Sequence, residues 1–228
     1  MEANPNTKQF LGAIVLQQKH QANPGAPTPY LIIDGQQRIT TAYLVLLGLA
    51  ELMRNFNDFE SANTIIESYL AINTSRYRGE PKVVPTAQDR ECFYGILRDS
   101  TTYEDWNFNG EPASGNIKSK IESQWKRIKV ALQDRLITAR GRLRKTEWIK
   151  LGNILLDNLE MVVITLEVDE DPNIIFSRLN ASGTPLGIAD LVRNSVFSRF
   201  EERNPRKSDL FYNEKWLPYE KTLKKANH

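Results

Sequence analysis

The chain has 228 residues, of which 40% are hydrophobic and 25% charged, and its formal net charge is +2. This composition is ordinary for a globular protein that is long enough to bury a core, and so small a net charge does not by itself indicate a nucleic-acid partner. The single cysteine, Cys92, excludes an internal disulfide and a cysteine-rich zinc site. The sequence has no apolar run near the ~20 residues of a membrane span and no signal-peptide pattern, so we expect a cytoplasmic protein without a membrane partner.

The first quarter of the chain predicts two strands and a helix. A strand over 10–20 becomes polar at its end, and a loop rich in proline leads to an isoleucine-rich buried strand at 30–34. From Ile39 to Arg54 apolar residues recur at helical spacing on most sides, which predicts a largely buried helix.

Helical patterns dominate the remainder. The expected elements are, in order, an ambiguous helix or strand at 63–72, an extended stretch at 82–85, a helix from about Thr86 with a capping box to Asp89, an amphipathic helix over 116–140, a strand at 160–171, a helix–turn–helix over 172–200 and a helix from 211. This pattern indicates an α/β (α+β) fold with few strands and an extensive helical remainder. We expect one domain over 1–200, with a helical insertion at about 55–150, and the start of a truncated helical segment at 201–228.

The turn between the strand at 30–34 and its helix is unusually polar: Asp34, Gly35, Gln36, Gln37 and Arg38. A helix N-terminus attracts anions, and phosphates above all. Gly35 permits close backbone approach, while Arg38 adds a planar fork of donors that matches a phosphate. The two glutamines could orient a water or read a base or sugar edge.

Other members of this turn leave alternatives open. Thr40 and Thr41 lie in the first helical turn, where their hydroxyls can reach a phosphate or a metal. Asp34 can hold a divalent cation, act as a base or pair with Arg38. The alternative without a ligand is that Asp34 only caps the helix, Arg38 pairs with Asp34 or another acid, and the glutamines are solvated.

A second polar constellation surrounds a glycine turn late in the chain. Its members are Arg178, Asn180, Ser182, Gly183, Thr184, Asp190, Arg193 and Asn194. Two arginine-bearing turns, each at a helix start, suit a polyphosphate ligand. The competing interpretation is a surface ion pair between Asp190 and Arg193.

Local charge is strongly positive over residues 116–145, which hold ten lysines and arginines against two acids. We interpret the cations of the helix itself as a solvated face. The run after it, with Arg140, Arg142, Arg144 and Lys145, is the better candidate for contact with a DNA backbone.

Two long strings, LIIDGQQRITT at 31–41 and EDPNIIFSRLNASGTPLGIADLVRN at 170–194, resemble the DGQQR family. These are the N-terminal domains of GmrSD-type modification-dependent restriction enzymes and of Ssp-type phosphorothioate-sensing defence proteins. Secondary matches are FLGAIVL, EPKVVPTAQDRECFYGIL and FYNEKWLPYE.

The resemblance implies a ParB/sulfiredoxin-like core that binds and hydrolyses a nucleoside triphosphate with Mg²⁺, as the sensor of an anti-phage DNA restriction system. By resemblance, the turn at Asp34–Arg38 corresponds to the hydrolysis motif; Arg178, Asn180, Gly183, Asp190, Arg193 and Asn194 correspond to the second motif. The alternative is a DNA-binding module that recognises modified DNA without hydrolysis. Which base the nucleotide carries, which DNA modification is sensed and whether the chain forms a homo-oligomer stay open.

Two family features have no match in the chain. One is a tyrosine- and arginine-containing segment that precedes the first strand, and the other is a C-terminal histidine-asparagine-histidine nuclease motif. Only His20 and His228 are present. We therefore expect DNA cleavage to require a nuclease domain or subunit outside this chain.

Overall fold

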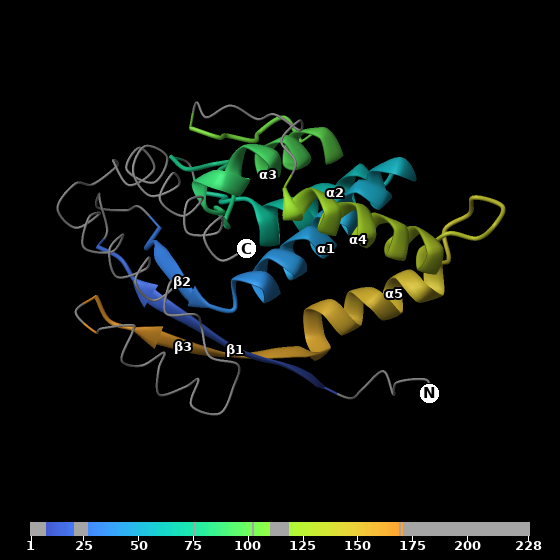
Figure 1. Ribbon diagram of the computed structural model, residues 1–228. Helices are drawn as coiled ribbons and strands as arrows, with labels where there is room; N and C mark the ends of the chain where they lie inside the picture. Colours follow the sequence, from blue (N-terminus) through green and yellow to red (C-terminus); the bar gives the residue numbers. More distant parts are fainter. Residues whose placement is uncertain are drawn as a thin grey trace, which may run out of the picture. The chain divides into compact units, whose positions relative to one another are not determined.

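The structure is a computed structural model that describes residues 8–20, 27–74, 76–101, 103–109, 119–168 and 170 (Figure 1). The chain divides into two compact units, Met1–Val168 and Asp169–His228, and nearly all described residues belong to the first. The expected helix–turn–helix at 172–200 and the segment at 201–228 lie outside the described residues. The division of the chain at residue 200 stays a prediction.

Three strands form a mixed sheet, which with the helices confirms the expected α/β class. Strand β1 (Gln9–Gln18) lies between β2 (Tyr30–Asp34) and β3 (Leu159–Leu166). It pairs antiparallel with β2 and parallel with β3. Parallel pairing requires a long crossover, and all the described helices lie in the connection from β2 to β3 (Figure 1). The three strands occur where the sequence predicts them.

Helix α1 (Gln36–Asn55) is the central element of the helical part. Its side chains at Leu44, Leu47 and Ala50 are fully buried. Around it pack α2 (Phe59–Ile65), η1 (Ile66–Leu70), α3 (Ala87–Ser100) and α4 (Lys120–Leu136) (Figure 1). The predicted buried helix is confirmed, because the apolar residues on most of its sides each meet a neighbouring helix.

The ambiguous segment at 63–72 is helical as far as Leu70, after which Ala71 is extended and pairs with Pro81. It continues α2 into the π-helical turn η1, where Ile66 and Leu70 are fully buried in the main core. A helical path places these two residues, four apart, on the same side, and a strand would also have done so. The local pattern therefore does not distinguish helix from strand here, and the observed helix packs against α1.

The expected capping box at Thr86 is wrong. Thr86 precedes α3, but its side chain makes no capping hydrogen bond. Asp89 instead accepts a hydrogen bond from the hydroxyl of Ser119, whose Oγ in turn accepts from the backbone N–H of Ile121 at the start of α4. Asp89 is engaged between two helices and is not available to cap its own.

The long amphipathic helix ends earlier than predicted. Helix α4 stops at Leu136, and Ile137 is extended because it pairs with Leu143 in a short hairpin. A further helical stretch, α5 (Lys145–Asn153) and η2 (Ile154–Asn158), leads into β3 and was not predicted. No helix within the described ranges is long and apolar enough to cross a membrane.

Candidate functional site

The polar turn lies where β2 passes into α1, close to the middle of β1. Gly35 is the residue before the helix, in a left-handed conformation with φ 88° and ψ 11°, and α1 begins at Gln36. Within the described ranges no side chain accepts a hydrogen bond from the backbone N–H groups at this end, so the alternative that Asp34 caps the helix is wrong. The first backbone N–H groups of the helix, including those of Gln37 and Arg38, lack intrahelical acceptors. The turn therefore presents donors and the positive helix end together.

The described residues hold the guanidinium of Arg38 at one corner. Its Nη1 donates to the carbonyl oxygen of Ala13 in β1 at 2.5 Å and lies 3.6 Å from Oδ2 of Asp34. The Arg38 and Asp34 side chains are 39% and 42% exposed, so this ion pair contributes little to stability. Within the described part of the chain, Nε and Nη2 of Arg38 have no acceptor, which leaves most of the donor fork available for a ligand.

Two glycines with positive φ make room for this guanidinium. A Cβ built on Gly12 (φ 97°) would lie 3.3 Å from Nε of Arg38 and 3.4 Å from its Cζ. A Cβ built on Gly35 would lie 3.2 Å from Nη1 of Arg38 and only 2.4 Å from Cγ2 of Ile14. The pairing of β1 with β3 shifts register between Phe10 and Ala13, which is a bulge around Gly12.

Sequence reasoning did not single out Gly12. The available signal was one glycine inside the apolar strand pattern FLGAIVL, which indicates a bulge or a close approach of another group. In the structure Gly12 lies in a bulge and is also closely approached by another group. The neighbouring carbonyl of Ala13 accepts from Arg38, and the missing Cβ of Gly12 leaves space for the guanidinium.

The two glutamines differ in their availability. The side chain of Gln36 donates to the carbonyl oxygen of Ile32 at 3.0 Å and so ties the helix start to β2. Gln37 is exposed, and among the described residues its side chain has no hydrogen-bond partner. Gln37 is therefore the better placed of the two to orient a water or a ligand.

The two threonines also differ. Thr40 is half-buried, and the described residues offer its hydroxyl no partner. The hydroxyl of Thr41 donates to the carbonyl oxygen of Gln37 at 2.7 Å and accepts from Nε2 of Gln124 at 2.5 Å. Gln124 belongs to α4 and could not be foreseen, because it is far from the turn in sequence and one of several polar residues on its helix.

A metal site built from protein groups alone is not found in the described part of the chain. No group of three or more histidine, cysteine, aspartate or glutamate side chains that could hold a metal ion occurs among the described residues. Asp34 supplies a single, half-exposed carboxylate. One carboxylate suits Mg²⁺, which keeps several waters and takes further ligands from substrate phosphates.

The second predicted constellation lies outside the described residues: Arg178, Asn180, Ser182, Gly183, Thr184, Asp190, Arg193 and Asn194. Its contribution to the turn at Asp34 stays a prediction.

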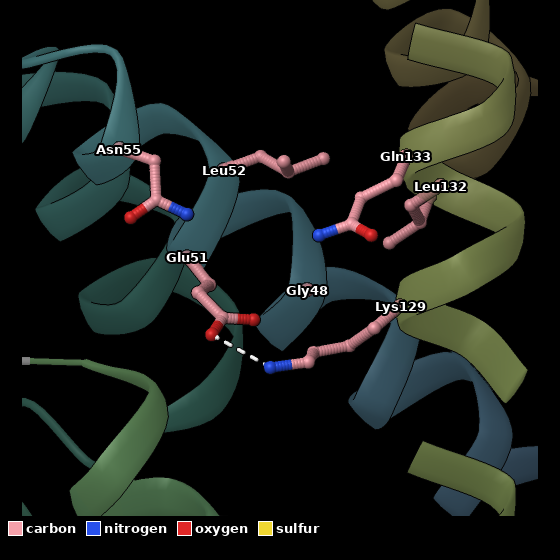
Figure 2. Close-up of a pocket in the computed structure, with 7 residues that line it drawn as sticks. All are labelled: Gly48, Glu51, Leu52, Asn55, Lys129, Leu132 and Gln133. Atoms are coloured by element: carbon pink, nitrogen blue, oxygen red, sulfur yellow. Dashed lines mark hydrogen bonds and ion pairs between the residues drawn. The ribbon is translucent and has the colours of Figure 1, made fainter. Parts of the chain in front are cut away.

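A small cavity between α1 and α4 is not a ligand site (Figure 2). Its volume is about 20 Å³, which is room for about one water. Lys129 and Glu51 form an ion pair of 3.1 Å across its mouth. Lys126 likewise pairs with Glu122. The exposed Lys126 fits the interpretation of these helix cations as a solvated face, whereas Lys129 is partly buried against Glu51.

Cys92 is buried in the main core, as expected for a small apolar side chain. Burial raises the pKa of its thiol, which disfavours the thiolate. It is therefore not a candidate nucleophile.

Comparison with known proteins gives one family. The model of the family described as the N-terminal domain of the GmrSD restriction endonuclease matches residues 3–197. No curated protein and no solved structure matches the chain.

Proposed function

Because the chain belongs to the family of GmrSD restriction endonuclease N-terminal domains, it is a protein of a DNA restriction system, and we propose that its turn at Asp34–Arg38 binds and hydrolyses a nucleoside triphosphate. In this proposal the chain is the sensor or regulatory part, which responds to modified DNA. A separate nuclease domain or subunit performs the cleavage.

The observation that carries the proposal is the partly anchored guanidinium of Arg38. One nitrogen is fixed by the carbonyl oxygen of Ala13, while Nε and Nη2 remain free among the described residues. An arginine held in this way keeps its fork in a defined orientation, and binding a phosphate then costs little side-chain entropy. The uncapped start of α1 adds backbone donors beside it.

The remaining residues take roles that fit their contacts. Gln37 would orient the attacking water, because its side chain is exposed and has no partner among the described residues. Asp34 would accept a proton from that water or bind Mg²⁺ through one oxygen. The Mg²⁺ that accompanies a nucleoside triphosphate neutralises phosphate charge. Gln36 and Thr41 would position the turn through their bonds to Ile32 and Gln37.

A second candidate function rests on the exposure of this turn. A guanidinium that is 39% exposed can also receive a phosphate of a DNA backbone. The chain would then bind modified DNA without hydrolysing a nucleotide.

Phosphate release distinguishes the two functions. The chain is incubated with Mg²⁺ and ATP, GTP, CTP or UTP, and compared with Arg38→Ala, Arg38→Lys and the matched control Arg98→Ala, which removes an exposed arginine elsewhere. A charge-assisted hydrogen bond contributes about 1.5–3 kcal/mol, so Arg38→Ala should lower kcat/KM by about 10- to 100-fold. Arg38→Lys should restore little, because an ammonium lacks the fork. Equal turnover in folded Arg38→Ala would reject the nucleotide proposal.

A further inference from the structure

The connection between α4 and α5 is a short β-hairpin that carries a run of cations. The backbone N–H of Arg144 donates to Leu136, that of Thr138 to Arg142 and that of Gly141 to Thr138, each at 2.8 Å. The Oγ1 of Thr138 also accepts from the N–H of Arg142 at 3.0 Å. In Figure 1 this hairpin (yellow) extends beyond the ends of both helices. Its backbone is therefore held in one shape although it is exposed.

The base of the hairpin is fixed in the protein interior. Leu136 is fully buried, and Leu143, which pairs with Ile137, packs against the same apolar cluster. Gly141 at the tip has φ 70°, a conformation that lets the chain reverse within a few residues. The arginines on either side of Gly141 are thus presented on a supported loop.

The charges of the hairpin are unbalanced. From Arg135 to Lys145 the sequence has five cations and no acid. Arg135 pairs with Glu147 at 3.7 Å, and Arg144 donates to the carbonyl oxygen of Arg135. Arg140, Arg142 and Lys145 are exposed and have no acidic partner in the described ranges. On α4, Lys126 and Lys129 are paired with glutamates, whereas Lys120 and Arg127 are exposed and have no acidic partner among the described residues.

We propose that the hairpin of residues 137–145 is a contact for the phosphate backbone of duplex DNA, made chiefly by Arg140 and Arg142. Arginine donors match phosphate oxygens. An exposed arginine without an acidic protein partner can bind a phosphate without first breaking an ion pair. Two extended segments about 5 Å apart are narrow beside a major groove about 12 Å wide, so the tip can approach phosphates on its rim. The inference rests on the role in DNA restriction and not on nucleotide hydrolysis.

The two hairpin arginines are tested against two helix cations. Fluorescence anisotropy measures the Kd of the chain for a labelled DNA duplex of about 20 base pairs at several salt concentrations. Arg140→Gln with Arg142→Gln is compared with Lys120→Gln with Arg127→Gln, which removes the same charge from exposed positions of α4. Thermal unfolding verifies that each variant is folded, and Arg140→Gln alone is used if the double variant is not.

The hairpin variant should weaken DNA binding by about tenfold or more, and the slope of log K against log salt should fall by about two, because two phosphate contacts are lost. The α4 variant should change Kd by less than about threefold. An equal loss of DNA affinity in both variants would mean that only net charge matters and would overturn the inference. Unchanged DNA binding by the hairpin variant, or a preference of the same arginines for duplex RNA, would overturn it as well.

The result of the DNA-binding experiment does not depend on whether the turn at Asp34 hydrolyses a nucleotide. If phosphate release is absent but the hairpin variant loses DNA binding, only the nucleotide proposal fails. If phosphate release depends on Arg38 but the hairpin variant binds DNA normally, only the hairpin proposal fails.

Discussion

Replacing Gly35 with alanine tests whether the turn that positions Arg38 is built as described. Two costs are expected at this position. An L-residue in the left-handed conformation costs about 1–2 kcal/mol, and Gly35 has φ 88° and ψ 11°. The new Cβ would also lie 2.4 Å from Cγ2 of Ile14, a buried and stiff side chain, and overpacking of this kind costs about 1–3 kcal/mol. Gly35→Ala should therefore lower the free energy of unfolding by about 2–5 kcal/mol.

Gly141 supplies the matched control. It also has a left-handed φ, 70°, but a Cβ there would meet nothing within 4 Å. Gly141→Ala should cost only the backbone part, about 1–2 kcal/mol. Urea unfolding followed by circular dichroism gives both values, provided that the m-value is unchanged.

A double-mutant cycle with Ile14 separates the clash from the backbone cost. Ile14→Ala alone should cost about 2–4 kcal/mol as a large-to-small core change. In its background Gly35→Ala should cost less than in the wild type, because the 2.4 Å contact with Cγ2 is gone and only the 3.0 Å contact with Cβ of residue 14 is added to the backbone cost of about 1–2 kcal/mol. The coupling between the two sites should then be about 1–3 kcal/mol. Coupling below about 0.5 kcal/mol, or a Gly35→Ala cost no larger than that of Gly141→Ala, would refute this description of the turn.

Two further predictions concern the support of α1. Burial holds the pKa of Tyr43 well above its usual value of 10, and its hydroxyl donates to the carbonyl oxygen of Leu70 at 2.8 Å. Tyr43→Phe should lower the free energy of unfolding by about 1 kcal/mol at pH 7. Because the phenol ionises at lower pH in the unfolded chain than in the folded one, its contribution to the free energy of unfolding is complete below pH 10 and is lost as the pH rises further. Urea titrations at increasing pH should show a smaller loss of stability for Tyr43→Phe than for the wild type. Gln124→Leu removes the bond to Thr41 and should lower phosphate release severalfold, with a change in unfolding free energy below about 1 kcal/mol; unchanged release would exclude a positioning role.

The sequence predicted the elements that have a strong local signal. The strand at 30–34 is a short isoleucine-rich run that stops at a glycine, and the helix after it has apolar residues at helical spacing throughout. Even there the helix starts at Gln36 and not at Ile39, because polar residues in a first turn carry no apolar periodicity.

Other features depend on contacts that are distant in sequence. Asp89 matches a capping box, yet its carboxylate bonds to Ser119. The helix α5 was missed because its apolar side is short and only partly buried: Trp148 and Leu151 of α5, together with Leu155 of η2, meet the smaller core cluster. Local sequence patterns do not predict such contacts, because the contacting residues lie far apart along the chain.

The candidate site was predicted in composition but not in detail. The turn, the helix end and the arginine beside them follow from the local sequence. The carbonyl of Ala13, the space above Gly12 and the bond from Gln124 come from other elements. They decide which groups of the turn stay available to a ligand.

Calorimetric titration of the chain with a non-hydrolysable nucleoside triphosphate and Mg²⁺ measures whether the turn at Asp34–Arg38 binds a nucleotide. We expect saturable binding by the wild-type chain and an affinity at least about tenfold lower for Arg38→Ala, since a charge-assisted bond of about 1.5–3 kcal/mol is lost. Equal affinity in the two proteins, or no binding by a folded wild-type chain, would contradict it.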